Sequence, residues 1–104
     1  MEKSVPSFAS LKKFYPFYLA EHANITCRRL HFFGSTLVLI FVGIAIYRQN
    51  PNWLFFALFS GYGFAWIGHF FFEHNRPATF KYPIYSFISD WIMYMQILSG
   101  KVKI

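Results

Sequence analysis

Three histidines and one glutamate could form a polar site in an otherwise apolar chain. His31 lies nineteen residues before Asn50, His69 lies nineteen residues after it, and Glu73 follows His69 by four. If the chain turns at Asn50, the two imidazoles reach the same depth on neighbouring antiparallel helices. Imidazole and carboxylate are ligands that divalent transition metals use in proteins, so the pattern predicts a metal site.

The polar residues around these histidines recur at helical spacing. Steps of four, three and four join Asn24, Arg28, His31 and Ser35, and likewise Tyr62, Trp66, His69 and Glu73. Side chains at these steps share one face of a helix, so we expect two polar stripes to face one cavity.

His22 approaches the same region from the N-terminal side. On one continuous helix, the nine residues between His22 and His31 would turn through roughly 900° and place the rings on opposite faces. The two can share a site only if the chain bends between them, and Asn24 is a suitable N-cap for a helix that starts there. We therefore expect His22, His31 and His69 to bind the metal and Asn24 to support them. A histidine at the end of a membrane helix can also be an interfacial anchor, which is the interpretation we favour for His74.

Two acidic residues need partners. Asp90 is expected about 10 Å along a helix that begins at Pro83. A carboxylate at that depth is costly unless it is paired, so it should support the site by meeting Arg28, Arg29 or the outer N–H of a histidine. Glu73 could bind the metal, or it could pair at the surface with Arg76, three residues later.

The elements that position these residues are membrane helices. The chain has 104 residues, of which 56% are hydrophobic and 13% charged. A water-soluble domain of about 100 residues has too little interior to hide so much apolar surface. The runs 30–47 and 53–72 are long enough to cross a bilayer, and the polar turn between them predicts an antiparallel hairpin.

We therefore predict an all-α integral membrane bundle formed by a single domain, 1–104. Its parts are an interfacial helix over 1–22, a helix with the first span over 24–48, a second span over 52–74 and a third membrane helix over 83–98. The third helix either crosses the bilayer or packs as a partly re-entrant helix. Pro16 should kink the first helix or split it into two pieces.

Basic residues are distributed unequally about the hairpin. Seven flank its open end and one, Arg48, lies in its turn. This imbalance predicts a cytoplasmic N-terminus and a cytoplasmic site. Topology and anionic lipid then account for most of the net charge of +6, which leaves little for a nucleic-acid interface. Cys27 has no partner for an intramolecular disulfide. Whether Cys27 or His74 takes part in the site is left open.

The ligand types leave several functions open. Three imidazoles and a carboxylate suit Fe(II), and also Zn(II) or Mn(II). A b-type haem is a competing cofactor, because His31 and His69 could bind it from two facing helices as in an electron carrier. A non-catalytic membrane scaffold is the third possibility.

Two segments resemble a known family. They are FYPFYLAEHANITCRRLHFFGS (14–35), with H-x-N before R-x-L-H, and GYGFAWIGHFFFEHNRPATFKYPIYSFISDWIMY (61–94), with I-G-H-x-x-x-E-x-x-R-P-A. Both are similar to small membrane proteins related to the fungal 2-hydroxy-fatty-acid dioxygenase of phytosphingosine degradation. The resemblance implies an Fe(II)-dependent dioxygenase that cleaves C1–C2 of a 2-hydroxy long-chain fatty acid. It places the iron ligands at His22, His31 and His69, and an acidic position of the family at Glu73.

The resemblance also sets expectations for partners and location. Glu73 would be a fourth ligand or would orient one, dioxygen would be the second substrate, and Arg28 or Arg29 would neutralise the fatty-acid carboxylate. The chain is shorter than the fungal enzymes and is similar to the compact bacterial branch of the family. We therefore expect a multi-pass protein of a bacterial inner membrane that acts on a membrane lipid or fatty acid, and a homo-oligomer is possible.

Overall fold

The chain folds into helices joined by short turns. A computed structural model describes residues 7–75 and 81–104. The elements are α1 (Leu11–Ala20), α2 (Ile25–Tyr47), α3 (Trp53–Ile67), the π-helix η1 (Gly68–Glu73) and α4 (Pro83–Leu98). The predicted all-α fold is confirmed. Two of its helices, Ile25–Tyr47 and the continuous Trp53–Glu73, are long and apolar enough to cross a membrane.

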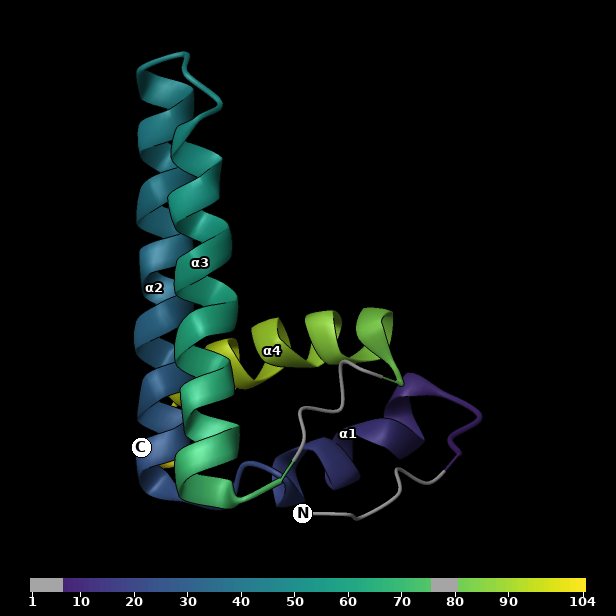
Figure 1. Cartoon of the computed structure of the whole chain (residues 1–104). Coiled ribbons are helices and arrows are strands. Elements are labelled where there is room, and N and C mark those ends of the chain that lie inside the picture. The colour runs from purple at the N-terminus through teal and green to yellow at the C-terminus, as the bar shows by residue number, and fades with distance from the viewer. Residues whose placement is uncertain (1–6, 76–80) are drawn as a thin grey trace.

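α2 and α3 form an antiparallel hairpin whose turn lies far from the rest of the chain (Figure 1). Small residues let the two backbones approach closely, and Gly34 is buried where α2 meets Ser60 of α3. A Cβ atom added to Gly34 would lie only 2.7 Å from the Ser60 carbonyl oxygen. Large side chains such as Ile46 and Phe59, which are 72% and 74% exposed, cover the outside of the hairpin. An apolar surface of this kind is suited to lipid.

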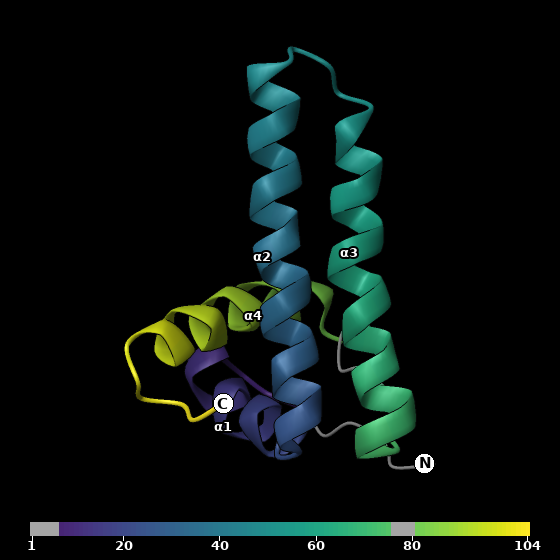
Figure 2. The same cartoon turned by 90° about the vertical axis from the view of Figure 1, so that its left-hand side faces the viewer.

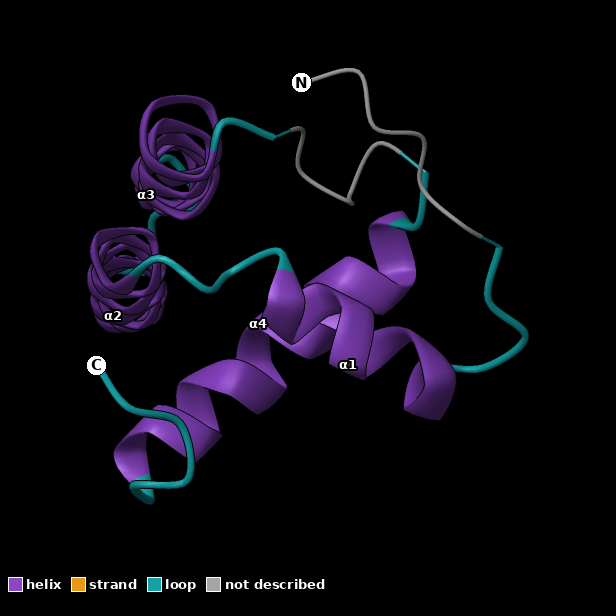
Figure 3. Cartoon of the chain, turned by 90° about the horizontal axis from the view of Figure 1, so that it is seen from below, coloured by secondary structure: helices purple, strands orange, loops and turns teal. Residues whose placement is uncertain are grey.

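α1 and α4 lie next to each other on one side of the lower half of the hairpin and run at a steep angle to it (Figures 1 and 3). α4 does not run alongside the two spans but packs against α1 and α2, as a packed third helix would. A core forms where α1, α4 and the C-terminal segment meet, and Figure 2 shows that segment returning toward the start of α2. The buried members of this core are Phe14, Tyr18, Met93, Ile97 and Val102.

Pro16 does not split α1, which was one of the two outcomes predicted for it. The helix is assigned without a break from Leu11 to Ala20, with Ser10 as its N-cap. A proline inside a helix removes one hydrogen bond, here to the carbonyl of Lys12. Pro16 and Lys12 are both exposed, so that carbonyl can be satisfied by solvent. The helix is also shorter than the predicted segment 1–22, of which residues 1–6 lie outside the described part of the chain.

Candidate metal centre

A sharp bend brings His22 back onto α2. α1 ends at Ala20, and Asn24 caps α2 by accepting hydrogen bonds from the backbone N–H groups of Thr26 and Cys27 at 2.8 and 3.2 Å. The cap fixes an extended residue between the two helices, so the second helix starts in a new direction. His22 therefore does not lie on the helix that carries His31, as sharing a site requires.

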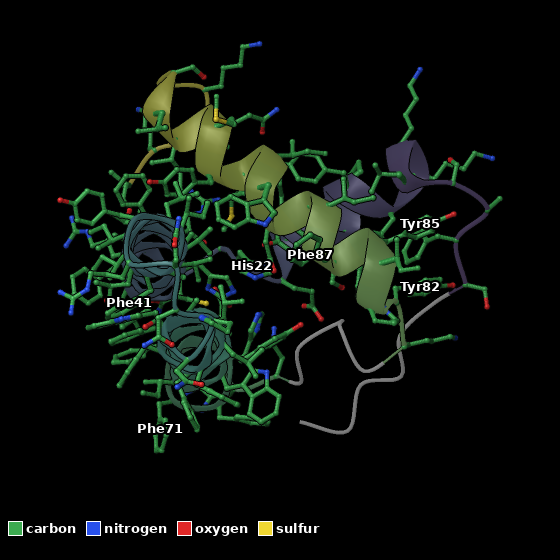
Figure 4. The ribbon with its side chains drawn as sticks, turned by 90° about the horizontal axis from the view of Figure 1, so that it is seen from above. His22, Phe41, Phe71, Tyr82, Tyr85 and Phe87 are labelled. Carbon is green, nitrogen blue, oxygen red and sulfur yellow. The ribbon has the colours of Figure 1, made fainter. Side chains whose placement is uncertain are left out.

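His22, His31 and His69 form one buried cluster. Their exposed fractions are 1%, 7% and 2%, and one ring nitrogen from each lies within 4.8 Å of the others. The Nε2 atoms of His22 and His31 are 3.0 Å apart. The rings are nearly perpendicular to one another, and the centroids of His31 and His69 are 5.1 Å apart. Figure 4 shows His22 between α4 and the hairpin, whereas Phe71 points away from both.

An oxygen acceptor orients each of these rings through Nδ1. His22 Nδ1 lies 2.6 Å from the carbonyl oxygen of Tyr18, and His31 Nδ1 lies 3.0 Å from that of Cys27. His69 Nδ1 lies 2.7 Å from Oδ1 of Asn75. Since these oxygens can only accept, each Nδ1 carries the proton and each Nε2 has a lone pair. Metal-binding histidines are held by outer partners in the same way.

The donor set fits a metal ion. Two Nε2 lone pairs 3.0 Å apart repel each other unless a proton or a cation lies between them. Protonation is disfavoured at His22, because burial, followed by the nearby His31 and His69, holds its pKa well below the usual 6.5. Two nitrogens bound at about 2.1 Å and at right angles to one ion would be about 3.0 Å apart. The three side chains could therefore hold a divalent metal and leave coordination positions open.

The π-helix η1 explains how Asn75, which the sequence analysis did not single out, reaches His69. Asn75 follows His69 by six residues, a step that places two side chains on different faces of an α-helix. The wider turns of η1 and the left-handed His74, with φ of 57°, bring Asn75 back to His69. Asn75 is 8% exposed, and its Nδ2 also donates to the carbonyl oxygen of Glu21 at 3.3 Å. Short π-helical segments are rare but often lie at functional sites. The helical periodicity of a sequence does not predict where they occur.

Glu73, predicted to be a fourth ligand, to orient one or to pair at the surface, is not part of the histidine cluster. Its carboxylate accepts a hydrogen bond from the backbone N–H of Asn24. The first N–H groups of a helix have no partner within the helix, so an acidic group from η1 is well placed to meet them. Glu73 thus joins the two helices that carry His31 and His69. Arg76, its alternative partner, lies outside the described residues.

Asp90 and the two arginines also differ from the predictions. Asp90 accepts a hydrogen bond from the hydroxyl of Tyr18, and not from Arg28, Arg29 or any of the three clustered histidines. The Tyr18 ring stacks on His22 with centroids 4.0 Å apart, so this bond steadies His22 indirectly. Burial raises the pKa of Asp90 to about 7, and the Tyr18 hydrogen bond opposes that shift.

The guanidinium group of Arg28 donates hydrogen bonds to two backbone carbonyl oxygens. Its Nε donates to the carbonyl oxygen of His22 at 2.7 Å, and its Nη1 donates to that of Lys103 at 3.2 Å. Arg29 is exposed. Neither arginine lines the cavity beside the histidines. The sequence left open whether Cys27 or His74 takes part in the site. The backbone carbonyl oxygen of Cys27 accepts a hydrogen bond from His31, whereas His74 is exposed.

The sequence as a whole matches a known family. The family described as 2-hydroxy-palmitic acid dioxygenase Mpo1-like matches residues 8–102. The chain belongs to this family. No match was found among curated proteins or among solved structures. All three clustered histidines fall within the matched Mpo1-like region.

The geometry of this Mpo1-like site does not favour haem. A haem bound by two histidines needs its planar ring between the two imidazoles. Here the His22 ring lies 4.3 and 4.4 Å, centroid to centroid, from those of His31 and His69. It would occupy the space of the macrocycle. Three converging imidazoles suit a single metal ion instead.

A mostly apolar cavity opens beside the histidines of this Mpo1-like chain. It follows the seam between α2 and α3 to Leu54, near the hairpin turn, and α4 forms one of its walls. The fifteen residues between His69 and Leu54 correspond to about 22 Å along a helix. Of the predicted polar stripes, the members that line it are His31, Ser35, Tyr62, Trp66 and His69, whereas Asn24, Arg28 and Glu73 do not. The cavity has the form expected for a long, narrow ligand with a polar end.

Proposed function

We propose that this protein is an Fe(II)-dependent dioxygenase that removes C1 from a 2-hydroxy long-chain fatty acid. The observation that carries the proposal is the convergence of three buried imidazoles at one end of a mostly apolar cavity. Membership of the Mpo1-like family supports the reaction class. Cleavage of C1–C2 by one dioxygen balances as a four-electron oxidation, which gives the acid one carbon shorter, carbon dioxide and water.

The residues of the chain have separate tasks in this reaction. His22, His31 and His69 would hold the iron, which supplies dioxygen activation and positive charge for the substrate carboxylate. The acceptors on Tyr18, Cys27 and Asn75 keep the three rings in the metal-binding tautomer. The apolar walls bind the alkyl chain and keep water away from the reacting carbons.

The position of the site suggests how substrate arrives. The histidines lie at the open end of the hairpin, where most of the flanking basic residues are found, and this end is predicted to be cytoplasmic. The cavity runs from that level toward the hairpin turn. A fatty acid could enter from the inner leaflet with its carboxylate at the headgroup level and its tail along the seam. Placement in a bacterial inner membrane is part of this proposal.

A product assay tests the function. Iron-loaded protein in mild detergent, given 2-hydroxyhexadecanoic acid labelled at C1 and dioxygen, should release labelled carbon dioxide and pentadecanoic acid, as measured by mass spectrometry. The His74→Ala variant should match the wild type, since His74 is exposed and lies outside the cluster. Iron-loaded wild-type protein that yields no shortened acid would refute the proposed reaction, and a scaffold role would then be preferred.

A further inference from the structure

One polar edge of the cavity makes no direct contact with the three histidines in the hydrogen bonds described above. Ser86 and Asp90 lie four residues apart on α4, so they share one face of that helix, and both line the cavity. Ser86 is 4% exposed, and its Oγ has no hydrogen-bond partner in the described part of the chain. Buried hydroxyl groups nearly always have a partner. Because Ser86 lines the cavity, a ligand bound there could supply the missing partner.

Asp90 can make further hydrogen bonds at the same edge. Its Oδ1 accepts from the Tyr18 hydroxyl, and a carboxyl group keeps further acceptor capacity beyond that one bond. No lysine or arginine is found among the described residues that line the cavity. An additional donor for Asp90 can thus come from a ligand.

We propose that Ser86 and Asp90 form a subsite for an alcohol group of the ligand. If the proposed function holds, that group is the 2-hydroxyl of the fatty acid. A hydroxyl can donate to Asp90 and accept from Ser86 at once, which matches both side chains. A carboxylate only accepts, so it would give Asp90 no donor. An ammonium group could pair with Asp90 but would leave the Ser86 proton without an acceptor.

The subsite would make the enzyme selective for the hydroxylated acid. A fatty acid without the 2-hydroxyl leaves two buried polar groups unpaired when it fills the cavity. Sites built to hydrogen-bond a hydroxyl discriminate strongly against ligands that lack it. The wall formed by α4, and not the metal ligands alone, would then determine which acids bind.

Ligand binding without turnover tests the subsite. Equilibrium dialysis of full-length, iron-loaded protein under anaerobic conditions gives the Kd values of 2-hydroxyhexadecanoic acid, hexadecanoic acid and hexadecylamine. We expect the wild type to prefer the hydroxy acid over the plain acid by at least about tenfold. Ser86→Ala and Asp90→Asn should each lower this preference severalfold by weakening binding of the hydroxy acid, with little loss for the plain acid.

The chain offers a matched control for the serine change. Ser89 lies on the same helix, is 0% exposed and likewise has no described partner for its Oγ, but it does not line the cavity. Ser89→Ala should keep the wild-type preference. Asn at position 90 still offers an oxygen to Tyr18, so Asp90→Asn should fold.

Failure of the subsite and failure of the proposed function give different results. If iron-loaded wild type binds the acids but Ser86→Ala and Asp90→Asn keep its full preference, the subsite is wrong and the proposed function stands. Tighter binding of the amine than of the hydroxy acid would also overturn the subsite. If the wild type retains no iron or binds neither acid, both proposals are overturned together.

Discussion

Replacing His31 with alanine is expected to abolish stoichiometric iron binding and, with it, oxygenase activity. His31 supplies one of three ligand atoms, and its Nε2 is 3.0 Å from that of His22. Loss of an outer partner of a ligand typically costs 10–100-fold in metal affinity, and loss of the ligand itself should cost more. Iron content after anaerobic purification in detergent, measured by elemental analysis, gives the result directly.

Two further variants should show a smaller loss of iron binding or none. Asn75→Ala removes the acceptor that orients His69 but leaves all three imidazoles, so we expect a loss of about 10–100-fold in iron affinity. His74→Ala changes an exposed histidine one residue away and should retain the full iron content. An Asn75→Ala loss as large as that of His31→Ala would mean that folding, and not coordination, was affected. Unchanged iron in His31→Ala would contradict the ligand set.

Adding one methyl group at Gly34 is expected to separate the helices of the hairpin. The new Cβ would lie 2.7 Å from the Ser60 carbonyl oxygen and 3.1 Å from Cβ of Phe64. The Ser60 oxygen belongs to the backbone of α3 and cannot rotate away, so the helices must move apart. Overpacking of this kind typically destabilises a protein by about 1–3 kcal/mol. Iron affinity should fall as well, because His31 lies one turn from Gly34.

Gly43→Ala is the matched control on the same helix. A Cβ at Gly43 would meet no described atom within 4 Å, and alanine favours helix by up to about 1 kcal/mol relative to glycine. Unfolding of both variants in mixed micelles, followed by circular dichroism, should show Gly34→Ala destabilised and Gly43→Ala equal to the wild type or more stable. Equal stability of Gly34→Ala and wild type would show that the two backbones are not in contact.

The parts of the site that follow from regular geometry could be predicted from the sequence. Equal distances from the turn placed His31 and His69 at one level, and they do lie side by side. The position of His22 depended on a bend at Asn24, which that residue provides as a helix cap. Each of these inferences uses helical spacing or a local capping preference, both of which are set by residues close together in the chain.

The partners of the polar side chains could not be predicted in the same way. Asp90 needed a hydrogen-bond donor, but the choice of Tyr18 over Arg28 depends on how α1 and α4 pack, and their contacts join distant parts of the sequence. Asn75 reaches His69 only because the chain changes from α to π geometry after Ile67. Glu73 accepts a hydrogen bond from the backbone N–H of Asn24, at the start of a different helix. Long-range packing decides such pairings, whereas periodicity indicates only which residues share a face.

X-ray absorption spectroscopy of the iron-loaded protein tests the three-histidine centre most directly. We predict scattering from three imidazole rings bound through nitrogen at about 2.1 Å, with one ring fewer in any iron that the His22→Ala variant retains. Iron without imidazole scattering, or an imidazole signal unchanged in that variant, would contradict the assignment of His22, His31 and His69 as the metal ligands.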